Sequence, residues 1–149
     1  MIDALVINIK SVPPEGLKRT LELEPKVLLM DLEVDGSEEA AVAFEGLLRL
    51  DMSIEIATGE LIIESRIEHI LKLFCSRCLD EFKLPFDKNC ILNYNIQNSD
   101  SIDISDSIRE EVILSYPQKP LCREGCAGIC LTCRVNLNRE ECKCRIAEN

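Results

Sequence analysis

A chain of 149 residues has the length of one ordinary domain, which is enough to bury a core without disulfide staples. Its hydrophobic fraction of 46% excludes intrinsic disorder. Its net charge of −10 excludes a protein that coats nucleic acid, because such a field repels phosphates over most of the surface.

The N-terminal residues favour short strands. Apolar residues are enriched in Val6–Lys10, Leu17–Leu23 and Leu28–Val34, and prolines and an Asp35-Gly36 pair supply turns between these runs. Charged residues interrupt every apolar run before it reaches the roughly 18 residues of a membrane-spanning helix, so no membrane association is expected.

The clearest strand signal lies in the middle of the chain. Apolar and polar residues alternate with a period of two over Leu48–Ile56 and again over Leu61–Leu73, with turn residues between the two runs. This pattern predicts a long hairpin. The single histidine, His69, falls on its inward phase and is interpreted as a hydrogen-bonded packing residue.

A further strand is predicted over Phe82–Ile96, with a bend near Pro85. The polar segment Gln97–Asp106 offers little to bury and is interpreted as a mobile loop. The capping-box spacing of Ser107 and Glu110 then indicates a short helix that ends before Pro117.

These elements predict a mainly β (α+β) fold. Residues 1–118 would form an antiparallel, strand-rich domain, barrel-like or a sandwich, with one short helix. Residues 119–149 hold six cysteines and no strand pattern, so we expect a cysteine-rich zinc module that packs on the first part as one structural unit.

Nine cysteines need an explanation. Met1–Val12 lacks the basic segment and long apolar run of a secretory signal, so a reducing, cytoplasmic location is expected, where clustered cysteines are metal ligands or redox thiols. Cys90 shares the apolar phase of its strand and is predicted to be a buried core thiol. The other eight are candidate ligands of one or two structural Zn²⁺ ions: Cys75, Cys78, Cys122, Cys126, Cys130, Cys133, Cys142 and Cys144.

Sequence proximity suggests how these ligands are divided. Cys130, Cys133, Cys142 and Cys144 form a compact local set, which leaves Cys75, Cys78, Cys122 and Cys126 for a second set. A mixed grouping of the same eight cysteines is the alternative.

The chain resembles the YceD family of large ribosomal RNA subunit accumulation proteins over about residues 45–145. The segments that carry the resemblance are Cys75-Ser-Arg-Cys78-Leu with Phe82, Ile108-Arg-Glu-Glu with Pro117, Cys126-Ala-Gly-Ile-Cys130-Leu-Thr-Cys133, Leu137-Asn138 and Cys142-Lys-Cys144. Arg134 stands where the family usually has glycine, and Leu131 where it often has proline.

The resemblance implies a non-enzymatic ribosome biogenesis factor that supports accumulation of large-subunit ribosomal RNA. Its partners would be a ribosomal protein, a large-subunit RNA precursor or both, with no small-molecule substrate. Common catalytic motifs are also missing from the sequence. Two alternatives remain: a thiol redox protein that uses its Cys-x2-Cys pairs, and a zinc-dependent nucleic-acid-binding regulator.

Overall fold

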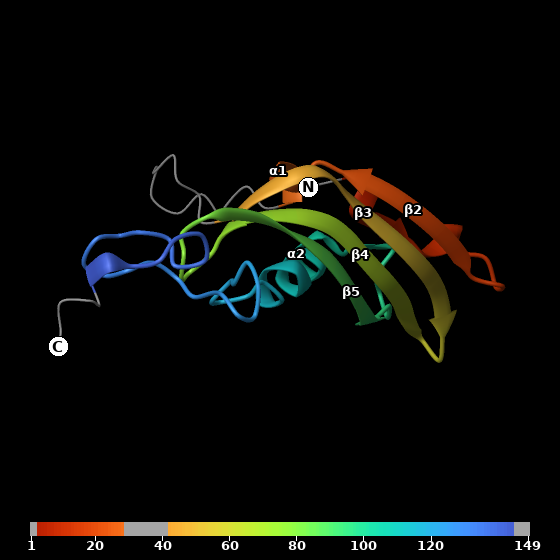
Figure 1. Ribbon diagram of the computed structural model, residues 1–149. Coiled ribbons are helices and arrows are strands. Elements are labelled where there is room, and N and C mark those ends of the chain that lie inside the picture. The colour runs from red at the N-terminus through yellow and green to blue at the C-terminus, as the bar shows by residue number, and fades with distance from the viewer. Residues whose placement is uncertain (1–2, 29–41, 145–149) are drawn as a thin grey trace.

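The computed structural model describes residues 3–28 and 42–144, and its main feature is a curved antiparallel sheet (Figure 1). The sheet has the strand order β2-β3-β4-β5. Its strands are β2 (Leu17–Leu23), β3 (Val42–Ala57), β4 (Glu60–Phe74) and β5 (Glu81–Asn95).

Smaller elements complete the fold. A second sheet pairs β1 (Val6–Asn8) with β6 (Ser101–Asp103), and two 3-10 turns, Asp3–Leu5 and Ile9–Ser11, flank β1. The helices are α1 (Pro25–Leu28) and α2 (Ser105–Leu114). The predicted mainly β, antiparallel class is confirmed. The main sheet is open, with β2 and β5 at its edges, where a barrel or sandwich was expected, and α1 is present beside the one short helix predicted.

The hairpin of β3 and β4 is the longest feature, as the alternation predicts. Its turn is the two-residue pair Thr58-Gly59, and both residues have positive φ, 52° and 82°. This geometry matches the right-handed twist of the flanking strands, which lets them pair from the turn outward. The register shifts between Glu45 and Arg49, where Gly46 has a φ of 74°.

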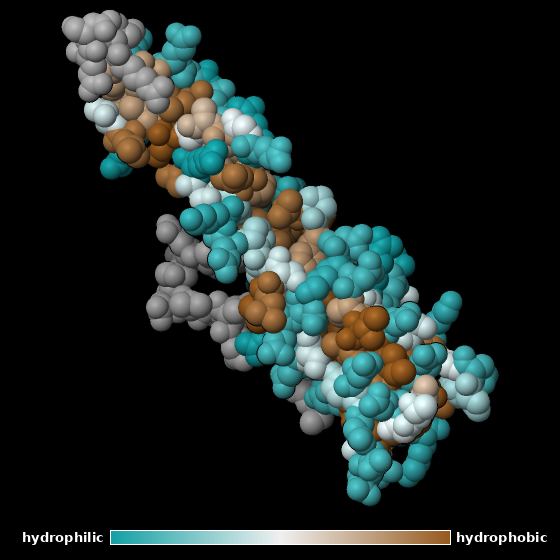
Figure 2. All heavy atoms as spheres, turned by 90° about the horizontal axis from the view of Figure 1, so that it is seen from below, coloured by the Kyte–Doolittle hydropathy of each residue, from teal (hydrophilic) through white to brown (hydrophobic). Residues whose placement is uncertain are grey.

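The core lies between the concave face of the main sheet and α2, which sits below that face in Figure 1. Alternate residues of β4 point inward and are fully buried, including Leu61, Ile63 and Ile67, and Ile108 and Val112 of α2 meet them in one cluster. Seen from the side of α2, the exposed surface shows apolar side chains in separate patches divided by hydrophilic ones (Figure 2).

Two polar contacts fix α2 to β5. The ammonium of Lys88 lies 2.6 Å from Oε2 of Glu111, and the hydroxyl of Tyr94 donates a hydrogen bond to Oγ of Ser107. Both β5 residues project from the concave face, so the helix is held along its length. No helix among the described residues is long and apolar enough to cross a membrane.

The polar segment before α2 differs from the expected loop. It contains β6, whose three residues pair with β1, and α2 begins at Ser105, before the predicted capping box. Oδ1 of Asp103 accepts a hydrogen bond from the backbone N–H of Ser105 at 2.9 Å, so a side chain just before the helix organises its first turn. Ile104, at the N-cap position, makes no side-chain capping bond.

The other expected elements are close to those observed. The strand predicted at Leu17–Leu23 is β2, and β5 pairs with β4 in continuous register through Pro85, as an edge strand permits. The predicted first strand ends at Asn8 and continues as a 3-10 turn. Of the strand expected at Leu28–Val34, Leu28 belongs to α1 and the rest lies outside the described residues.

His69 is buried on the concave face among aromatic rings. It stacks on Phe86 at a centroid distance of 4.4 Å, and Phe44 and Tyr116 lie 5.9 and 6.2 Å away. Neither ring nitrogen has a hydrogen-bond partner within residues 3–28 and 42–144, so the expected hydrogen bond is wrong. Burial lowers the pKa of His69 to about 4, because an apolar site disfavours the imidazolium.

His69 should make the fold acid-sensitive. Its folded-state pKa of about 4 lies below the ordinary value of 6.5, so its neutral form stabilises the fold fully above pH 6.5, and this contribution is lost as the pH falls toward 4. We expect the urea midpoint of the native chain to fall more steeply over this range than that of His69→Leu. Parallel curves for the two proteins would contradict this assignment.

Candidate metal centres

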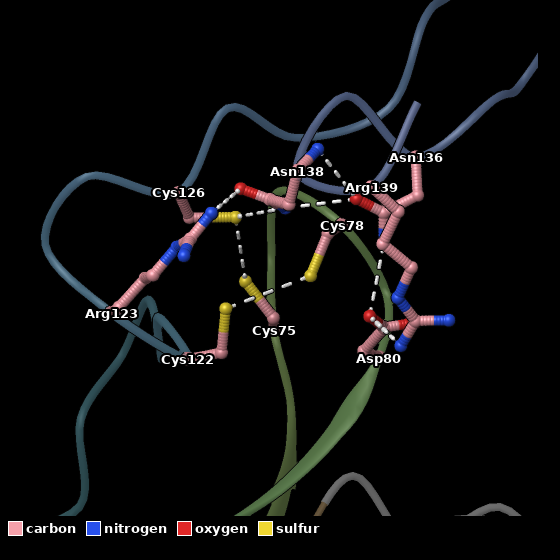
Figure 3. A network of polar contacts seen from close by, with 9 residues as sticks. All are labelled: Cys75, Cys78, Asp80, Cys122, Arg123, Cys126, Asn136, Asn138 and Arg139. Atoms are coloured by element: carbon pink, nitrogen blue, oxygen red, sulfur yellow. Dashed lines mark hydrogen bonds and ion pairs between the residues drawn. The ribbon is translucent and has the colours of Figure 1, made fainter. Parts of the chain in front are cut away.

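The first cluster forms where the hairpin of β4 and β5 meets the tail. Between these strands, Cys75 and Cys78 occupy a tight turn in which the N–H of Leu79 donates to the carbonyl of Cys75 at 2.9 Å and Leu79 has a φ of 62°. The tail brings Cys122 and Cys126 to this turn. The Sγ–Sγ distance is 3.7 Å for Cys75–Cys126 and also for Cys78–Cys122 (Figure 3).

The second cluster lies within the tail and repeats the same turn. The N–H of Arg134 donates to the carbonyl of Cys130 at 2.8 Å, and Arg134 has a φ of 60°. Arg134 thus adopts the left-handed conformation at a position where the family usually has glycine. Sγ of Cys142 lies 3.7 Å from that of Cys133 and 3.2 Å from that of Cys130, and Cys144 completes the set.

The structure brings the eight cysteines together in the two groups that sequence proximity suggests. Within each group the sulfur atoms all lie within 4.8 Å of one another. Four thiolates around a tetrahedral zinc ion, each at about 2.3 Å, would be about 3.8 Å apart, close to three of the four Sγ–Sγ distances given above. All nine cysteines are free thiols, so both groups fit Zn²⁺ in donor type, number and spacing.

Each cluster contains a thiol that ionises readily. Burial alone would raise the pKa of Cys75, but hydrogen bonds from the backbone N–H groups around it bring the value to about 6. The backbone N–H of Cys133, followed by the thiol of Cys142, lowers the pKa of Cys130 to about 6 as well. A thiolate is the form that binds a metal ion.

The two clusters differ in exposure. In the first, Cys75, Cys78 and Cys126 are buried, and they form a small core with Phe82, Leu121 and Ile129. In the second, Cys133 is exposed and the other three are half-buried. The first cluster is therefore enclosed by protein, whereas the second is open to solvent.

The tail contacts the Cys75–Cys78 turn closely. The N–H of Ile129 donates to the carbonyl of Arg77 at 3.1 Å, and Nη1 of Arg77 donates to the carbonyl of Cys126 at 3.1 Å. Gly128 has a φ of 79°, and a Cβ atom there would lie 3.1 Å from the same Arg77 carbonyl oxygen. A side chain at Gly128 would therefore push the tail away from the Cys75–Cys78 turn.

Sequence reasoning missed four polar residues around the first cluster (Figure 3). Asn136 and Asn138 lie in the tail between Cys133 and Cys142 of the second cluster, and their side chains point toward the first cluster. Asp80, two residues after Cys78, accepts hydrogen bonds from Asn136 and Arg139. The hints in the sequence are the two asparagines inside a cysteine-rich segment and the Leu137-Asn138 pair, which carries part of the family resemblance.

Cys90 lies outside both clusters. It is half-buried on β5 against the main core, and burial raises the pKa of its thiol. These features are those of a packing residue.

Comparison with known proteins places the similarity in the C-terminal part of the chain. Residues 92–148 match the family described as "Large ribosomal RNA subunit accumulation protein YceD", a shorter stretch than the resemblance anticipated. A protein of Arabidopsis thaliana named "Large ribosomal RNA subunit accumulation protein YCED homolog 1, chloroplastic" is 44% identical over 43 residues.

That alignment covers 29% of this chain and 13% of the relative, so the chain spans well under two thirds of the relative's length. No solved structure matches the chain. The matched residues run from β5 through α2 and carry six of the eight clustered cysteines. The resemblance seen in the sequence is confirmed for residues 92–148, which are similar to the YceD family.

Proposed function

We propose that this protein is a non-enzymatic ribosome biogenesis factor, a zinc-stapled adaptor that supports accumulation of large-subunit ribosomal RNA. The observation that carries the proposal is the match to a family named for large ribosomal RNA subunit accumulation. The matched residues include the tail, which contributes cysteines to both clusters. The name of the Arabidopsis thaliana relative also refers to large ribosomal RNA subunit accumulation.

In this proposal each cluster holds one structural Zn²⁺ ion. Cys75, Cys78, Cys122 and Cys126 would bind the first ion and thereby fasten residues 119–149 to the strand-rich part, residues 1–118, as one structural unit. The ligands of the second would be Cys130, Cys133, Cys142 and Cys144. The near-tetrahedral spacing of the sulfur atoms supports this over a redox role, in which thiols would work as pairs.

The non-enzymatic part of the proposal rests on the placement of the reactive side chains. His69 is enclosed by Phe44, Phe86 and Tyr116, so the chain's single imidazole is sealed from solvent and any substrate. Eight of the nine cysteines are grouped in fours.

The distribution of charge suggests that the strand-rich part and the tail contact different kinds of partner. With neutral thiols, residues 119–149 carry a net +2 and the rest of the chain −12. A Zn²⁺ ion with four thiolates adds −2, so an occupied second site brings the tail to about neutral, which still leaves the strand-rich part as the acidic surface suited to a basic ribosomal protein. Four cations on the convex face of the sheet are already in ion pairs: Arg49, Arg66, Lys72 and Lys83.

In the tail, by contrast, the side chains of Arg134 and Lys143 have no polar partner among the described residues, which leaves them to meet a phosphate of precursor RNA or an acidic protein surface. We place the protein in the cytoplasm, where the reduced cysteines would persist.

The metal content tests the zinc sites directly. The purified chain should bind two zinc ions, measured by inductively coupled plasma mass spectrometry, and Cys78→Ser and Cys142→Ser should each retain at most one. Cys90→Ser should retain both and lose about 1 kcal/mol of stability, because a hydroxyl replaces a half-buried thiol. Metal-free native protein with a protease-resistant tail would contradict the proposal.

The biological role is tested by the ratio of large-subunit to small-subunit ribosomal RNA. Cells that lack the protein should show a lower ratio, because the adaptor stabilises only the large-subunit precursor. When expressed in the deletion strain, Cys90→Ser should restore the ratio. The double variant Cys130→Ser with Cys133→Ser should not, since the tail then loses the cross-link of the second cluster. An unchanged ratio in the deletion strain would reject the role.

The tail cations are tested by affinity capture from growing cells, with identification of bound RNA and protein. Arg134→Ser with Lys143→Ser should weaken capture and make it less salt-dependent, because each lost phosphate contact lowers the salt slope by about 0.7–0.9. Arg123 is kept, since its guanidinium donates to Asn138 at 2.7 Å. The control variant Lys72→Ser with Lys83→Ser removes the same charge from the sheet and should bind its partners normally. An equal loss of captured RNA and protein in the two double variants would assign the effect to net charge.

A further inference from the structure

The loop that closes the second cluster reaches back to the first. We call residues 134–141, between Cys133 and Cys142, the bridging loop. Within it, Nδ2 of Asn138 donates to Sγ of Cys126 at 3.3 Å, so a residue outside the ligand set contacts a first-cluster sulfur (Figure 3).

The Asn138 side chain is held in this orientation on its other side. Its Oδ1 accepts from Nη2 of Arg123 at 2.7 Å and from the backbone N–H of Ala127 at 2.8 Å. These donors flank Cys126 in the sequence. The amide therefore caps the Cys122–Cys126 segment and presents its N–H to the sulfur.

A second anchor ties the bridging loop to the hairpin. Oδ2 of Asp80 accepts from Nδ2 of Asn136 at 2.9 Å and from Nη2 of Arg139 at 2.8 Å. The backbone carbonyl of Asp80 accepts from the N–H of Cys75 at 2.9 Å. The loop thus touches both halves of the first cluster, one through Cys126 and the other through the turn that carries Cys75.

The shape of the bridging loop depends in turn on the second cluster. The loop is flanked by Cys133 and Cys142, whose Sγ atoms are 3.7 Å apart, and the cluster that they belong to is open to solvent. Four thiolates at such spacing repel one another unless a cation lies among them. A metal ion in the second cluster would therefore fix the loop in the conformation that places Asn138 on Cys126.

We propose that the two clusters are energetically coupled through the bridging loop, with Asn138 as the positioning residue that links them. Metal at the second cluster strengthens metal binding at the first, and the effect is reciprocal because linkage requires it. This inference rests on the proposed zinc binding and deepens it. Groups that orient a metal ligand from outside the ligand set commonly change affinity 10–100-fold when removed.

The experiment loads the full chain with ¹¹³Cd²⁺, which gives each site its own NMR resonance, and measures affinity by chelator competition. Cys142→Ser abolishes the second-cluster resonance and so assigns both. Asn138→Ala should weaken Cd²⁺ binding at the first cluster about 10–100-fold and shift that resonance. Asn93→Ala, a matched change at an exposed asparagine of β5, should do neither.

Two further variants separate coupling from general loosening of the tail. Asn138→Asp retains an oxygen for Arg123 and Ala127 but replaces the amide group that donates to Sγ of Cys126 and to Oδ1 of Asn136 with a charged acceptor. It should fold normally by circular dichroism and still weaken the first site. Cys142→Ser, which removes no first-cluster ligand, should weaken the first site as well. Adding Asn138→Ala to Cys142→Ser should then have little extra effect, because the coupling is already broken.

The outcomes distinguish this inference from the function on which it rests. A chain that binds no metal at either cluster would overturn the proposed zinc sites themselves. Two bound ions with first-site affinity unchanged in Cys142→Ser would overturn the coupling. Two bound ions with a normal first site in Asn138→Asp would overturn the role of the Asn138 amide.

Discussion

The convergence of four sulfur atoms at the turn of the β4–β5 hairpin is the contact on which the C-terminal part of the structure depends. Beyond α2 the chain forms no strand in its described residues, only an isolated bridge between Ile129 and Asn136. The small core there is largely made of cysteines. Without a cross-link among the sulfurs, this segment buries too little apolar surface to offset the entropy of ordering it.

The sheet, by contrast, is stabilised by ordinary packing. The concave faces of β3 and β4 and one side of α2 bury a continuous apolar cluster, and the convex face carries cross-strand ion pairs such as Arg66 with Asp87. Exposed pairs of this kind contribute little free energy of unfolding. They do pair four cations of that face with carboxylates, so the positive charge available to a partner lies at Lys18 of β2 and in the tail.

The strands and the grouping of cysteines were predictable because both rest on local regularities. Alternation fixes which residues of β3 and β4 face inward, and short spacers such as that between Cys130 and Cys133 direct two sulfurs to one point. Three features were not predictable in this way. The polar strand β6 exists because β1 pairs with it. His69 lacks a hydrogen bond because aromatic side chains from β3, β5 and the segment after α2 surround it. Asn138, which lies between two cysteines of the second cluster, donates a hydrogen bond to a cysteine of the first.

The two clusters also differ in how much chain each must close. Cys78 and Cys122 are separated by 44 positions, whereas Cys133 and Cys142 are separated by 9. By the logarithmic dependence of loop closure on length, the longer loop costs about 1.4 kcal/mol more in chain entropy. The exposed cluster can therefore organise from local chain alone, whereas the enclosed one must wait for β4 and β5 to pair. The second cluster should therefore form first, and the contact of the tail with the β4–β5 turn should be the slower step, because it joins residues far apart in the sequence.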